Sequence, residues 1–296
     1  MTTAPEYLSR RLHNLHTPNS PTPADLEKGI LALFDDDHDS AFRILHPLAE
    51  DGIAEAQYAL GLMRTEGHGV PRDSIEGVKW LQRAAEQGLS LAEYGLGLMY
   101  LEGNGVTQNH EVALKWFKSA AEHGDELAQY QVGAMYCNGQ GVAVDHVEAK
   151  KWFDKSAKQG FDAAQCDLAI LYFKGLGTTQ NYSESFNWAT KAAEQGNGKA
   201  QYLLGLLHAR GQGTGYDPIE AYKWLDLAAA NQVPNALEAL RVVADQMNTS
   251  QITEAQERQR AWFGSHISSQ LFQSFSRPHA RDIRELLGNR TPDSAK

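Results

Sequence analysis

The chain has 296 residues, of which 42% are hydrophobic and 22% are charged, and its formal net charge is −10. This composition excludes a fibrous or wholly disordered chain, and the excess of acidic groups argues against binding to nucleic acid or to an anionic membrane. The sequence has no apolar run of about 18 residues, the length that a membrane span needs, and no apolar segment follows Arg10 and Arg11, as it would in a secretory signal. Its two cysteines are too few for a scaffold built on disulfides. We therefore expect a cytoplasmic protein without membrane insertion.

The first two segments precede the regular part of the sequence. Residues 1–22 are rich in proline, serine and threonine, so we expect a flexible N-terminal segment. Residues 23–53 match only the second half of the repeat described next, with Asp37 at the cap position and Ile44 in place of a tryptophan. We expect this stretch to form a degenerate capping repeat, because the end copies of an array lack a neighbour on one side.

Residues 54–233 contain five copies of a 36-residue sequence, with no insertion or deletion. Five of the six tryptophans recur at this period: Trp80, Trp116, Trp152, Trp188 and Trp224. Pairs of glycines and several alanines recur with them. A fixed period of this length is typical of repeat architectures.

Each copy reads as two helices joined by a turn. In the first copy, apolar residues at helical spacing predict a helix from Ala54 to about Glu66, which Gly67 ends. Asp73 is expected to cap a second helix, and a glutamate three residues later would complete a capping box in four of the five copies. One helix pair cannot bury its apolar face alone, so the copies must stack. The sequence therefore predicts an all-α fold, an α/α superhelical solenoid of 36-residue helix-turn-helix repeats.

Two further segments follow the array. Residues 234–265 continue the pattern weakly, with Ala236 at a first-helix position and Trp262 in a later helix, and we expect them to form capping helices. Residues 266–296 form a C-terminal tail, in which Ile283 and the leucine pair after it indicate a short helix. That helix would either fold back as a final cap or dock on a partner.

The repeated residues resemble those of the Sel-one-like repeat family, which is related to tetratricopeptide repeats. The shared pattern is A-x-A-Q-Y-x-L-G-x-M-Y, then G-x-G-V, then D, then A-x-x-W-x-x-x-A-A-x-x-G, and it covers residues 54–233. The resemblance implies a right-handed superhelix whose relatives mostly act as adaptors or scaffolds for protein or peptide partners. Some secreted relatives carry a disulfide in each repeat and are linked to peptidoglycan or penicillin binding, but their paired cysteines are absent here.

The sequence shows no catalytic, cofactor-binding or metal-binding motif. Ser-x-x-Lys and His-Glu-x-x-His are both absent, and the glycine pairs lack the Lys-Ser/Thr of a phosphate loop. Cys166 occupies a column that holds tyrosine in the other copies, so we expect a core thiol. Cys137, at the end of a first helix, has no recognisable base partner in the sequence. We therefore expect a protein that is not an enzyme and that uses no cofactor and no metal.

Positions that differ among the copies are where a specific partner would be recognised, and three of them share one face of the first helix. We name each position of the repeat by the number of the residue that holds it in the first copy. Position 62 is mostly apolar, position 66 changes from acidic to basic along the array, and position 59 varies. The residues predicted to bind a partner are Leu62, Glu66, Leu98, Glu102, Gln131, Asn138, Asp167, Ile170, Lys174, Leu206 and Arg210. The alternative interpretation is that position 62 belongs to the core and position 66 to a solvated rim.

The first functional hypothesis is an adaptor, scaffold or regulator that binds a protein or peptide in a concave groove lined by the first helices. The alternative is an immunity or inhibitor protein that blocks one partner enzyme. An enzyme related to the peptidoglycan-linked or β-lactam-hydrolysing proteins would need export and a nucleophile, and the sequence indicates neither. The oligomeric state is left open.

Overall fold

The structure is a computed structural model that describes residues 24–276, with side chains through residue 265. The predicted flexible segment 1–22 and the short helix predicted around Ile283 lie outside the described residues. The described residues form fourteen helices and no strand, as predicted, and divide into two compact units at Ala120 and Ala121.

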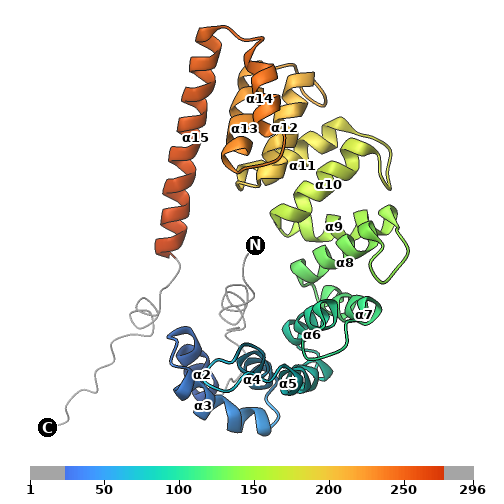
Figure 1. Cartoon of the computed structure of the whole chain (residues 1–296), viewed down its shortest axis with the longest axis vertical. Helices are drawn as coiled ribbons and strands as arrows, with labels where there is room; N and C mark the ends of the chain where they lie inside the picture. The colour runs from blue at the N-terminus through green and yellow to red at the C-terminus, as the bar shows by residue number, and fades with distance from the viewer. Residues whose placement is uncertain (1–23, 277–296) are drawn as a thin grey trace, which may run out of the picture. The chain divides into compact units, whose positions relative to one another are not determined.

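The first unit contains the helices before this division (Figure 1). They are α2 (Ala24–Phe34), α3 (His38–Glu50), α4 (Ala54–Glu66), α5 (Ser74–Glu86), α6 (Ser90–Glu102) and most of α7 (His110–Glu122). From α2 to α6, each helix packs against the next one in the chain, and α4 with α5 forms the first complete repeat. The expected helix from Ala54 to Glu66 and the expected start of the second helix near residue 74 are both confirmed.

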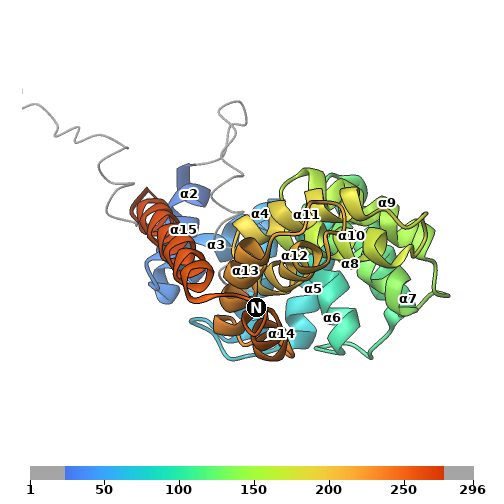
Figure 2. The ribbon, with the colours of Figure 1, turned by 90° about the horizontal axis from the view of Figure 1, so that it is seen from above.

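The second unit contains the remaining three repeats and two further helices (Figures 1 and 2). The repeats are α8 (Glu126–Asn138) with α9 (His146–Lys158), α10 (Asp162–Lys174) with α11 (Tyr182–Glu194), and α12 (Gly198–Arg210) with α13 (Pro218–Ala230). They are followed by α14 (Ala236–Ala244) and by α15 (Thr249–Ser276), which belongs to this unit up to Phe272. Within this unit, α14 packs on α13, whereas α15 is a long helix that continues past residue 265.

The predicted N-caps form, but the capping boxes do not close as expected. The Asp73 side chain accepts a hydrogen bond from the backbone N–H of Glu76 at 3.0 Å, and the equivalent residues of the other copies act in the same way. The backbone N–H of Asp73, however, donates to the carbonyl oxygen of Arg64 at 2.7 Å instead of to Glu76. Because the last carbonyls of a helix lack partners inside that helix, the returning turn satisfies one of them. The glutamate is then free to pair with Lys79, at 3.0 Å.

The two glycines of each pair have different structural roles. Gly175 ends α10 in the left-handed conformation with φ of 69°, which a side chain disfavours. A Cβ atom at Gly177 would clash with the backbone carbonyl of His146, in the first turn of the preceding second helix. The first glycine therefore stops the helix, and the second lets the turn approach the neighbouring repeat.

The tryptophans join successive repeats. In the second unit, Trp188 packs against a core cluster of the preceding repeat that includes Ala149 and Phe153. Trp152 is only 7% exposed, and the ammonium group of Lys155 lies 3.8 Å from the centre of its ring. This distance is that of a cation–π contact between the ammonium group and the face of the ring.

A ladder of buried amides, which the sequence analysis did not identify, also connects the repeats. Gln165 of α10 donates from Nε2 to the carbonyl oxygen of Ala157 in α9 at 3.1 Å, and its Oε1 accepts from Gln195 of α11 at 2.8 Å. Gln195 donates in addition to the carbonyl oxygen of Gly160 at 3.1 Å. Each rung therefore ties three helices from two repeats. Equivalent first-helix rungs are Gln57, Gln129 and Gln201.

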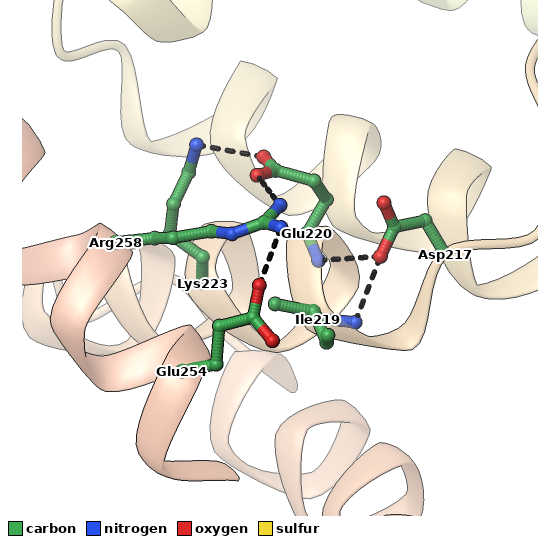
Figure 3. Close-up of polar contacts among 6 residues, drawn as sticks. All are labelled: Asp217, Ile219, Glu220, Lys223, Glu254 and Arg258. Carbon is green, nitrogen blue, oxygen red and sulfur yellow. Dashed lines mark hydrogen bonds and ion pairs between the residues drawn. The ribbon is translucent and has the colours of Figure 1, made fainter. Parts of the chain in front are cut away.

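Helix α15 is attached to the last repeat by charged contacts, which Figure 3 shows, and by an aromatic contact. Arg258 donates to Glu220 of α13 at 2.8 Å and to Glu254 at 2.7 Å, and Lys223 pairs with Glu220 at 2.7 Å. Burial acts to raise the pKa of Glu220, but the hydrogen bonds from Lys223 and Arg258 outweigh burial and lower the pKa. The ring of Trp262 stands edge-on to Trp224 at 5.9 Å. The first half of α15 thus contacts α13 through both an ion pair and an aromatic pair.

Candidate functional site

The residues predicted for partner binding occupy three environments on the first helices. Those at position 66 are exposed in both units: Glu66, Glu102, Asn138, Lys174 and Arg210. Those at position 62 are half-buried: Leu62, Leu98, Ile170 and Leu206. Gln131 and Asp167, at position 59, are also half-buried. Leu62 and Ile170 each pack on a core cluster while part of the side chain stays accessible, so position 62 lies at the boundary between core and surface.

Two of these residues line a cavity in the second unit. The cavity has a volume of about 360 Å³ and lies among α12, the turn that follows it, the start of α13, and α14. Leu206 and Arg210 contribute from α12, Tyr216 from the turn, and Val242 from α14. Tyr216 is 60% exposed and Val242 is 56% exposed, so two large apolar surfaces border the opening. The other predicted residues of this unit do not line the cavity.

The sequence of α14 explains why a cavity forms here. One period after Tyr202, the chain has Glu238 instead of an aromatic residue. In the first unit, the tyrosine at this position, Tyr58, is fully buried and fills space in the core. Helix α14 is also shorter than the other first helices. It ends at Ala244, so Gln246, which lies one period after Arg210, is outside the helix. A missing ring and a short helix therefore leave space beside α12.

The two charged residues that line the cavity come from different helices. Glu238 is in the first turn of α14, and Arg210 is the last residue of α12. Both line the cavity, and neither forms an ion pair with another residue of the described part of the chain. The lining also includes the apolar residues Leu206, Leu225 and Val243. The arrangement suits an occupant with an apolar centre and charged ends.

Asp167 lies in α10 of the same unit and does not line the cavity. Burial raises the pKa of its carboxyl group, and a hydrogen bond from Tyr130 together with the charge of Lys199 offsets only part of this effect. Burial also raises the pKa of Tyr130 well above its usual value, so this hydroxyl stays protonated as a donor. A half-buried carboxylate with a raised pKa on a predicted binding face is typical of a functional position, although ion networks also produce such shifts.

The two cysteines are free thiols. Cys166 is 2% exposed, and burial raises its pKa to about 12, in agreement with the expected core thiol. Cys137 has a neighbour that the sequence did not indicate, because Nδ1 of His146 lies 3.7 Å from its sulfur. The contact forms across the turn between α8 and α9. Burial, followed by the charge of Asp167, nevertheless raises the pKa of Cys137, which disfavours the reactive thiolate.

The part of the chain that the structure describes has neither a metal-binding cluster nor a membrane-spanning helix. Its side chains include no group of three or more His, Cys, Asp or Glu residues placed to hold a metal ion. None of its helices combines the length and apolar character that crossing a bilayer requires.

The chain was compared with protein families and with known proteins. The Sel1 repeat model matches residues 54–89, 90–125, 127–161, 162–197 and 198–233. No curated protein matches the chain. Among solved structures, a Sel1 repeat protein from Oxalobacter formigenes is 26% identical with a TM-score of 0.69, and the match covers 82% of this chain and 96% of that one.

Two other solved structures show lower similarity. A protective antigen of uropathogenic Escherichia coli is 20% identical with a TM-score of 0.40, over 90% of this chain and 79% of that one. An immunity protein from Pseudomonas aeruginosa is 16% identical with a TM-score of 0.40, over 80% of this chain and 81% of that one. Because five consecutive matches cover residues 54–233, the chain belongs to the Sel1 repeat family.

Proposed function

We propose that this protein is a non-catalytic interaction module that binds a protein or peptide partner on the surface of its first helices. The observation that carries the proposal is the contrast between two sets of repeated positions. The alanines at position 56 are fully buried in every copy, whereas the residues at position 66 are exposed and differ in charge. Buried repeated residues maintain the fold, and exposed variable residues can encode recognition.

In the second unit, the surface presents Lys174 and Arg210 as exposed cations at the ends of two first helices. Near them lie the apolar residues Ile170 and Leu206, which remain partly accessible. An acidic partner with apolar contact residues fits this combination, because desolvated apolar contacts supply affinity and charges select the partner and its orientation. We place this interaction in the cytoplasm, since both cysteines are free thiols.

Charge reversal tests the proposal. The full-length chain is first used to capture partners from the native cell, and one captured protein is purified for binding measurements. The Lys174→Glu substitution should weaken binding of that protein at least tenfold without changing the melting temperature. The matched control is Arg260→Glu in α15, which makes the same charge change at an exposed residue outside the first helices. Binding by Lys174→Glu that equals binding by Arg260→Glu would contradict the proposal.

The identity of the captured protein separates an adaptor from an inhibitor. An enzyme that loses activity when the chain binds would assign an inhibitory role, and a partner whose own activity is unchanged would assign an adaptor role. Both outcomes use the same surface.

A further inference from the structure

The cavity beside α12 combines three features that point to a particular kind of occupant. Its floor is apolar, with Leu206, Leu225 and Val243. Its two lining charges, Arg210 and Glu238, form no ion pair with another described residue. Charged side chains that are left without a partner beside an apolar surface can gain ion pairs from a ligand, and this gain depends on the orientation of the ligand.

The spacing of the charges follows from the repeat. Arg210 corresponds to position 66 of its repeat, and Glu238 corresponds to position 58 of the next one. Eight positions along parallel helices correspond to an axial offset of about 12 Å at ~1.5 Å per residue, and packed helices lie about 8–10 Å apart. Together these give a separation of about 14–16 Å, which an extended chain covers in about four to five residues at ~3.3 Å per residue. The charges on an extended ligand would therefore lie about four to five residues apart.

The rim indicates a ligand larger than the cavity itself. Tyr216 and Val242 border the opening and remain mostly exposed, so an occupant that extends over the rim would bury additional apolar surface. A volume of about 360 Å³ admits one or two large apolar side chains. A peptide segment meets both conditions, because one side chain enters the cavity while its backbone and neighbours cover the rim.

We propose that this cavity binds an extended peptide segment of a partner protein, with an apolar side chain on the floor, an acidic residue facing Arg210 and a basic residue facing Glu238. This inference rests on the proposed function and specifies the chemistry of the partner. The opposite charges at the two ends give the bound segment a single direction.

A random peptide library displayed on phage tests the charge order directly. The full-length chain should select peptides in which an acidic and a basic residue, about four to five positions apart, flank an apolar residue in one fixed order. The double variant Arg210→Glu/Glu238→Arg has the same net charge and should select the reverse order. Synthetic peptides from the first selection should bind the double variant at least tenfold more weakly than the original chain, as measured by fluorescence anisotropy.

Three results would overturn the inference: no enriched peptide, enriched peptides without a charge order, or the same order with both chains. A second variant, Val242→Arg, extends an exposed rim residue over the opening without altering the core. It should abolish binding of the selected peptides while circular dichroism shows an unchanged helix content. If the captured protein partner binds Val242→Arg normally but fails to bind Lys174→Glu, this inference is wrong and the proposed function stands.

Discussion

The amide ladder gives a prediction whose size can be worked out from the contacts. Replacing Gln165 with leucine keeps a side chain of similar volume in a position that is 5% exposed. The substitution removes the bond to the carbonyl of Ala157 at 3.1 Å and the bond from Gln195 at 2.8 Å. It leaves no buried group without a partner, because the Ala157 carbonyl still accepts from the N–H of Gly160 at 3.1 Å and Gln195 still donates to the Gly160 carbonyl.

The expected loss is therefore that of two ordinary hydrogen bonds. At about 0.5–1.5 kcal/mol each, Gln165→Leu should lower the free energy of unfolding by about 1–3 kcal/mol. Burying the leucine places the result toward the lower part of this range. In a unit of this size, that loss lowers the melting temperature by a few degrees, at about 2–4 °C per kcal/mol.

Equilibrium unfolding in urea, followed by circular dichroism, measures this difference. Gln140→Leu is the matched control, because Gln140 is an exposed residue of the turn after α8 and should change the free energy by less than about 0.5 kcal/mol. If Gln165→Leu is as stable as the control, the amide ladder does not stabilise the array and our account of how repeats are joined is wrong.

Two further predictions concern the titratable groups of the second unit. Burial raises the pKa of Asp167 above its ordinary value of 3.8, so the free energy of unfolding should fall as the pH rises through the folded-state pKa. The Asp167→Asn substitution should therefore raise the melting temperature at pH 7 but not at pH 3. A gain in melting temperature that is independent of pH would contradict this cause. Iodoacetamide at neutral pH should leave Cys166 of the folded chain unmodified and should modify Cys137 more slowly than free cysteine. Intact-mass spectrometry measures both rates, with the Cys137→Ser variant as the reference for Cys166. Rapid labelling of Cys166 would refute its burial.

Much of the fold could be predicted because it depends on local chemistry repeated five times. A helix that starts after an Asp cap and ends at a left-handed glycine, such as α9 after Asp145, depends on residues a few positions apart. The hydrogen bond from the backbone N–H of Asp73 to the side chain of Glu76 was predicted incorrectly, because it does not depend on local sequence alone. It depends on the path of the turn, which brings the N–H of Asp73 to the carbonyl of Arg64.

The amide ladder had a visible signal that the sequence analysis did not use. In four of the five copies, glutamine follows the buried alanine at position 56, and a glutamine or asparagine lies 30 positions later, as in Gln165 and Gln195. The second copy has Glu93 and His123 at these positions. A polar residue that repeats inside an apolar column is expected to have a partner, because a buried unpaired amide is costly. Identifying that partner requires the packing of three helices, which the period alone does not supply.

The candidate site was less predictable, because it arises where the repeat fails. Variation among the copies indicated Leu206 and Arg210, but it could not indicate Tyr216, Val242 or Glu238, which lie outside the chosen columns. The cavity requires both a glutamate in place of a tyrosine and a helix that ends at Ala244. Helix ends are the least reliable part of a prediction from sequence. In a repeat array, most of the repeated residues are needed for packing. A residue that differs from the repeat pattern, such as Glu238, can be selected for binding a partner without disturbing the fold. The exchange of Arg210 and Glu238 therefore tests whether this departure serves recognition or only ends the array.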